Sequence, residues 1–173
     1  MSWVTVADNG KLSVELRDVR WWMRLYVVDL IELLGPEPQQ PDDPLAALAA
    51  TAAADPERPS DPVLARLLPD GVLDDDVAAT EFRRFTHESL LTRKRAGAVA
   101  MLRLLDGAAR QLDRGEAQQL LGGINDLRLM LGTRLMVSED DQFRADDPSA
   151  LAVQRSYLML GWLQEQVLDA LLP

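Results

Sequence analysis

The spacing of apolar residues changes along the chain, from alternation near the N-terminus to helical periodicity over most of the rest. The stretch "WVTVADNGKLSVEL", residues 3–16, alternates apolar and polar positions on both sides of Asn9-Gly10. Asn and Gly tolerate the positive φ of a tight two-residue turn, so the pattern predicts a β-hairpin over residues 1–16. An isolated hairpin is marginally stable in water. We therefore expect it to pack on helices, and we expect no sheet larger than these two strands.

Four long stretches carry the 3.6-residue spacing of helices, at residues 18–34, 74–112, 116–137 and 148–172. An unbroken helix over 74–112 would be roughly 60 Å long, so we expect a bend or break between Thr92 and Gly97, where the apolar stripe changes phase. Further helix starts are predicted at three Asp-Pro pairs and at an acidic run, because Asp accepts unpaired amide protons and Pro suits the first helical position. These are residues 43–44, 61–62, 147–148 and 74–76. The predicted fold is mainly α, a helical bundle of about five to six helices with a small N-terminal β-hairpin.

Residues 36–62 hold seven of the chain's ten prolines, which predicts a Pro-rich connecting segment. The chain has 173 residues, 47% of them hydrophobic, which is enough apolar surface for one folded unit. We therefore expect a single helical domain over residues 1–173.

The amino-acid composition excludes several classes of protein. The chain contains no cysteine, which excludes disulfides, thiolate nucleophiles and sulfur-ligated zinc and favours a cytoplasmic location. We find no signal peptide pattern and expect no membrane span, because charged residues interrupt the most apolar stretch. Twenty-eight acidic residues against 18 basic ones give a formal charge of −10, which disfavours direct nucleic-acid binding.

Motifs of catalysis and of cofactor binding are missing from the sequence. There is no G-x-S-x-G, no Walker-type loop and no G-x-G-x-x-G, and His87 is the one histidine. The acidic runs lack the spacing of a calcium-binding loop. We therefore predict that the protein is not an enzyme and that it has no catalytic residues, no cofactor and no metal site.

The stretch 116–137 is apolar nearly all round, which predicts a helix at the centre of the bundle. It nevertheless carries a group of polar residues, namely Asn125, Asp126, Arg128 and Arg134. No carboxylate lies four residues from either arginine. The favoured interpretation is a set of ties to carboxylates of other helices, with candidates at Glu81, Glu88, Glu165, Asp29 and Glu32. On this interpretation Arg128→Ala and Arg134→Ala each cost about 1 to 3 kcal/mol of stability.

The alternative for this group is a set of ligand contacts, with an anion-binding pocket around Arg128 and Arg134. For Asn125 and Asp126, contacts with the backbone of a neighbouring loop are favoured. Trp21 and Trp22 are candidate interface residues, although burial in the protein's own core is favoured. The basic residues between Arg83 and Arg95 are predicted to form a solvated helix face rather than a binding patch.

Several segments resemble an actinobacterial family of otherwise uncharacterised function that is known as the oxidative-stress transcriptional regulator AosR. These are "DPVLARLLPD", "AATEFRRFT", "NDLRLMLGTRL" with the following "SEDD", and "YLMLGWLQEQVLDALL". The resemblance covers nearly the whole chain. It implies stress-responsive control of transcription through a protein partner such as a sigma factor or another transcription component, and it brings no catalytic residues.

Without cysteine, a thiol-based redox switch cannot operate in this chain. The leading hypothesis is a non-enzymatic cytoplasmic protein that regulates by binding another protein, and a homodimer is also considered. The alternative is a small-ligand binder or enzyme that uses Arg128 and Arg134.

Overall fold

The computed structural model describes residues 2–36, 42, 43, 45, 46, 49, 57–72, 74–107, 110–136 and 148–172. Its elements in chain order are β1 (Val4–Val6), β2 (Leu12–Val14), α1 (Arg20–Leu34), α3 (Pro62–Leu67), α4 (Asp76–Asp106), β3 (Arg110–Leu112), α5 (Arg114–Arg134) and α6 (Pro148–Leu171). The described residues thus form a mainly helical fold with one small antiparallel sheet, which confirms the predicted fold class.

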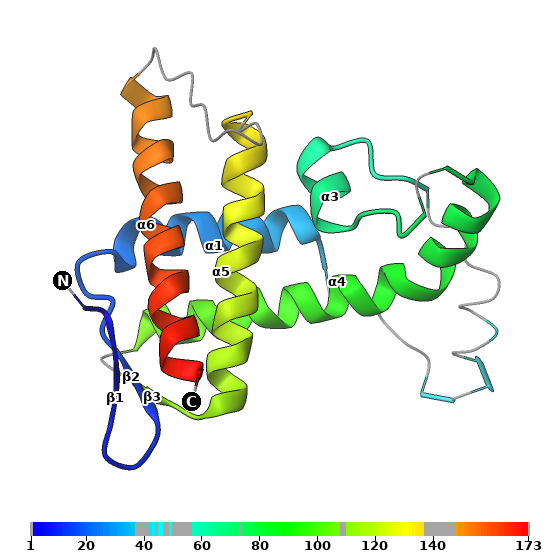
Figure 1. Ribbon diagram of the computed structural model, residues 1–173. Helices are drawn as coiled ribbons and strands as arrows, with labels where there is room; N and C mark the ends of the chain where they lie inside the picture. The colour runs from blue at the N-terminus through cyan, green and yellow to red at the C-terminus, as the bar shows by residue number, and fades with distance from the viewer. Residues whose placement is uncertain are drawn as a thin grey trace.

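The helices form two antiparallel pairs that cross each other (Figure 1). α5 and α6 pack side by side, and α1 and α4 pack side by side in a second layer that runs across them. The first part of α4 extends past α5 on the side where α3 lies. α3 also packs against α5. Among the described helices, α5 therefore contacts four others, namely α1, α3, α4 and α6.

α5 is the central helix, as its all-round apolar pattern predicts. Its buried residues are Ala117, Leu120, Gly123, Ile124, Asp126, Leu127, Met130 and Leu131. They belong to one continuous core that also takes in side chains from the sheet and the other helices. A helix buried on several sides must pair its polar groups with neighbours, because water cannot reach them.

The hairpin forms as predicted and packs on α6. Gly10 has a φ of 75° at the turn, and the Asn9 Oδ1 accepts a hydrogen bond from the Lys11 amide at 3.1 Å. The Gln166 side chain on α6 accepts a hydrogen bond from the Trp3 amide at 2.7 Å. The indole rings of Trp3 and Trp162 lie 5.3 Å apart, so the N-terminus is tied to α6 by polar and aromatic contacts.

The expectation of a two-stranded sheet is wrong. α4 ends at Asp106, and residues 110–112, predicted as helix, form β3 instead. β3 pairs antiparallel with β2, with Leu12 opposite Leu112, so the sheet order is β1-β2-β3. The third strand pairs an edge of β2 that would otherwise present unpaired amide and carbonyl groups, and it buries Leu112.

Of the predicted bend or break between Thr92 and Gly97, the break is absent, because α4 is continuous from Asp76 to Asp106. Its 31 residues span about 47 Å at 1.5 Å per residue. That length fits because the first part of the helix extends beyond α5 (Figure 1).

The predicted Asp caps are present where the structure describes them. The Asp61 carboxylate accepts hydrogen bonds from the Val63 and Leu64 amides, and Asp75 caps α4 in the same way. Asp43 accepts from the Leu45 amide at 3.1 Å. Asp147 and most of the Pro-rich segment 36–62 lie outside the described residues.

Candidate functional site

Asp126 faces α4 rather than the backbone of a loop. The residue is 5% exposed, and its Oδ1 accepts a hydrogen bond from Lys94 Nζ at 2.6 Å. Burial raises the pKa of the Asp126 carboxyl above its ordinary value, while Lys94, Arg93 and Asn125 oppose this increase. The predicted contact with a loop backbone is therefore wrong for Asp126, which forms a buried ion pair between α4 and α5.

Arg128 faces α6, where it meets neutral partners. Its guanidinium donates to the Gln164 side chain at 2.6 Å and to the Tyr157 hydroxyl at 3.3 Å. The guanidinium carbon also lies 4.9 Å from the centre of the Tyr157 ring, a cation-π contact. Within the described parts of the chain no carboxylate forms an ion pair with Arg128, so the predicted carboxylate partner is wrong for this arginine.

Arg134 faces α1 and pairs with Asp29, one of the predicted partners. Arg134 Nη1 lies 2.5 Å from Asp29 Oδ2, and the two side chains are 38% and 43% exposed. Arg128 and Arg134 therefore point to different helices, and Asp126 points to a third. The described cavities include none that Arg128 or Arg134 lines.

Three basic residues of α4, predicted to belong to a solvated helix face, instead bind groups on other parts of the fold. Arg83 Nη1 lies 2.5 Å from Asp70 Oδ1, and Lys94 pairs with Asp126. Arg95 donates to the Ile31 carbonyl oxygen at 3.3 Å and to the Gly35 carbonyl oxygen at the end of α1. The sequence spacing gave no signal for these ties, because their acceptors lie on other elements.

The two tryptophans at the start of α1 have different environments. Trp22 packs against the core, with its ring 6.0 Å from Tyr26. Trp21 is 69% exposed, and Leu25, one turn further on, is 62% exposed. The favoured expectation of core burial is therefore wrong for Trp21. We call Trp21 and Leu25, together with the exposed arginines Arg20 and Arg24 beside them, the α1 face.

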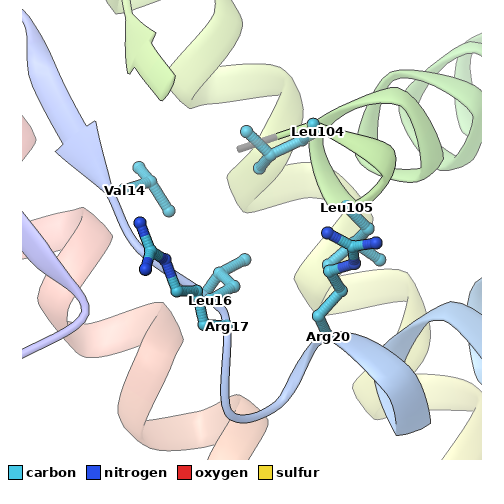
Figure 2. A pocket seen from close by; sticks show the side chains of 7 residues that line it. Val14, Leu16, Arg17, Arg20, Leu104 and Leu105 are labelled. Atoms are coloured by element: carbon cyan, nitrogen blue, oxygen red, sulfur yellow. The ribbon is translucent and has the colours of Figure 1, made fainter. Parts of the chain in front are cut away.

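A small cavity of about 190 Å³ lies next to the α1 face, between β2, the turn before α1 and the end of α4. Figure 2 shows Arg17 and Arg20 on either side of Leu16, with Leu104 of α4 opposite, and Leu105 of α4 also lines the cavity. Among the residues that the structure describes, neither Arg17 nor Arg20 forms a hydrogen bond or ion pair through its side chain. The cavity thus has apolar walls and two cationic groups at its edge.

The described residues include no group of three or more His, Cys, Asp or Glu side chains placed to hold a metal ion. Within the same part of the chain, no helix has both the length and the apolar character that crossing a bilayer requires.

A family model described as "Domain of unknown function (DUF2017)" matches residues 3–171, and the chain belongs to this family. Curated relatives include the "Oxidative stress regulator AosR" of Mycobacterium bovis and that of Mycobacterium tuberculosis. Each is 28% identical over 148 residues, which cover 76% of this chain and 68% of the relative. These matches confirm the resemblance seen in the sequence. No solved structure matches the chain.

Proposed function

We propose, starting from membership of the DUF2017 family, that this protein is a non-enzymatic cytoplasmic regulator that acts on stress-responsive transcription by binding another protein. The printed name of its mycobacterial relatives, oxidative stress regulator, supports the regulatory role. The partner is a sigma factor or another transcription component.

The exposure of Trp21 beside Leu25 is the observation that supports contact with a protein. A tryptophan that is 69% exposed leaves a large apolar ring in water, and Leu25 extends the apolar surface by one helical turn. Tryptophan and arginine are the residue types most enriched among those that dominate binding energy at interfaces. The α1 face combines both types on one rigid helix.

The charges around the α1 face favour an acidic partner segment. Arg17 and Arg20 carry positive charge at the edge of an apolar cavity, in a chain whose formal charge is −10. Opposite charges across an interface speed association and exclude wrong partners. The cavity volume of about 190 Å³ suits one apolar side chain, so the fitting segment has an apolar residue flanked by carboxylates.

The geometry gives less support to the alternative, a ligand pocket around Arg128 and Arg134. A shared pocket requires both guanidinium groups to point into one cavity. Arg128 is bound to Gln164 and Tyr157 on α6, whereas Arg134 is paired with Asp29 on α1.

The test is affinity capture from the native host with the full chain, followed by binding measurements with the purified partner. We expect a transcription component to bind the wild type, and Trp21→Ala to weaken that binding about tenfold or more, since a central interface tryptophan contributes about 2 kcal/mol or more. Phe85→Ala is the matched control, because Phe85 is 66% exposed on the distant part of α4.

Two outcomes contradict the proposal. One is the capture of no transcription component by the wild type. The other is equal binding of such a component by wild type and Trp21→Ala. Sedimentation of the purified protein distinguishes self-association from binding of another protein. A dimer that Trp21→Ala dissociates would assign the α1 face to a second copy of this chain.

A further inference from the structure

A larger cavity, about 550 Å³, lies between α4 and α5, away from the α1 face. This volume falls within the range of cavities that hold small molecules. The polar side chains that line it are Arg93, Lys94, Gln118, Gln119, Asn125 and Asp126. The proposed protein-contact role uses none of these residues.

Glycines keep this space open where the two helices separate. Gly97 and Gly123 let α4 and α5 approach closely, since a Cβ on Gly123 would lie 3.4 Å from the Gly97 carbonyl oxygen. Gly122 also lines the cavity, and a Cβ there would meet no atom within 4 Å. The helices therefore approach closely at these glycines and leave an unfilled space beside them.

The cavity wall carries charges that the fold holds in place. The Lys94 and Asp126 side chains are 14% and 8% exposed, and each is fixed by the other at 2.6 Å. An ammonium group has three donors, and the structure gives Lys94 one hydrogen bond, to Asp126. Arg93, the exposed residue directly before Lys94, adds a second cation to the lining. The lining therefore has one net positive charge.

Amide side chains stand around this positive charge. Gln118 and Gln119 lie on the face of α5 that also presents Asn125, and all three line the cavity. An amide group both donates and accepts hydrogen bonds, so it suits a ligand body that carries hydroxyl, amino or amide groups.

We propose that this cavity binds a small organic anion, whose carboxylate or phosphate group contacts Arg93 and Lys94 and whose polar body contacts the amide side chains. Charge-assisted hydrogen bonds to an oxyanion are stronger than neutral ones, and the partly enclosed position of Lys94 limits screening by solvent. The site is a candidate effector site, separate from the α1 face.

The test is nuclear magnetic resonance titration of the isotopically labelled full chain with three probes at constant ionic strength: acetate, inorganic phosphate and acetamide. Acetamide has the shape of acetate without its charge. We expect acetate or phosphate to shift the amide resonances of Gly97, Gly122 and Gly123 saturably, and acetamide to leave them in place. The probe that binds more tightly identifies the oxyanion that the natural ligand carries.

Arg93→Gln is the decisive variant, because the side chain is exposed and its loss leaves the core intact. We expect it to weaken the binding of the oxyanion about fivefold or more. Arg103→Gln is the control, since it removes the same charge from an exposed position on the same helix outside the cavity. Shifts that do not saturate, equal shifts with acetamide, or equal affinity in Arg93→Gln would overturn the proposal.

Discussion

Lys94 and Asp126 form an ion pair whose two side chains are largely removed from water, being 14% and 8% exposed. Moving two charges out of water costs several kcal/mol, and the attraction between them offsets that cost only while both are present. The pair ties α4 to α5 next to a cavity. Its contribution to stability is therefore best measured by removing one partner and then both.

Asp126→Ala leaves the Lys94 ammonium without its hydrogen-bond acceptor, and we expect it to lower the free energy of unfolding by about 1 to 3 kcal/mol. The double variant Lys94→Met, Asp126→Leu removes both charges and keeps apolar volume, so we expect it to recover most of that loss. Urea denaturation of the three proteins checks this. A double variant as unstable as Asp126→Ala would contradict it.

The raised pKa of Asp126 predicts a particular dependence of stability on pH. Because burial raises the folded-state pKa above the ordinary value of 3.8, the folded protein binds this proton more tightly than the unfolded chain does. The contribution of Asp126 to stability is therefore most favourable below pH 3.8 and is lost as the pH rises through the raised value. We expect the wild type to gain stability relative to the double variant as the pH falls through this window. Urea midpoints at a series of pH values measure the difference, and a difference that does not change with pH would contradict the prediction.

The two arginines of α5 are expected to differ in their effect on stability. Arg134 and Asp29 are 38% and 43% exposed, and exposed ion pairs contribute at most about 1 kcal/mol. Arg128 is half-buried and binds Gln164 and the Tyr157 ring, so Arg128→Ala should cost about 1 to 3 kcal/mol. Denaturant midpoints compare the two alanine variants. A larger loss for Arg134→Ala would contradict this ranking, which refines the common range of about 1 to 3 kcal/mol expected from the sequence for both variants.

At the scale of elements, the point where α4 crosses α5 depends on two adjacent glycines in different surroundings. A Cβ on Gly122 would meet open space, whereas one on Gly123 would lie 2.9 Å from the buried Met101 Cε and 3.4 Å from the Gly97 carbonyl oxygen. Gly122→Ala should therefore stabilise the helix by about 0.5 to 1 kcal/mol. Gly123→Ala should be less stable than Gly122→Ala by about 1 kcal/mol or more, since crowding offsets its gain in helix propensity. Thermal unfolding of both proteins checks the order, and equal stabilities would contradict it.

Local signals explain which elements the sequence could predict. Asn9-Gly10 marks the hairpin and Asp61-Pro62 the start of α3, because each acts through its own neighbouring backbone groups. β3 has no comparable signal, since residues 110–112 become a strand by pairing with β2, which is about 100 residues away in sequence. The continuity of α4 likewise depends on where the other helices leave room for it.

Partners between helices were predictable only in part, for the same physical reason. The pattern of α5 shows that its polar residues need partners, but hydrogen-bonding chemistry leaves several choices. Asp29 was among the candidates for Arg134, whereas Gln164 and Tyr157 were not considered for Arg128. The exposure of Trp21 was missed because its helix is apolar on more than one face, and the packing of α4 decides which face is covered.

At the scale of the whole molecule, negative charge dominates, and several of the basic side chains that the structure describes are committed to internal contacts. The formal charge is −10, and Arg83, Lys94 and Arg95 on α4 bind groups on other parts of the fold. Arg17 and Arg20 are the cations that border the cavity of Figure 2. A positive patch of this size suits a short acidic protein segment, whereas a duplex presents a phosphate at every step along both strands.

We therefore expect the purified protein to show no sequence-selective binding to duplex DNA at near-physiological salt. Neutralising several phosphates requires a continuous basic stripe, and each neutralised phosphate would add to the salt dependence of binding. Within the described residues Arg83, Lys94 and Arg95 of α4 are instead paired with Asp70, with Asp126 and with backbone carbonyl groups, respectively. Fluorescence anisotropy with promoter DNA from the host measures this, with a scrambled duplex of equal length as the control. Submicromolar binding that prefers the promoter sequence would contradict the expectation and would move the proposed action on transcription from a protein partner to the DNA itself.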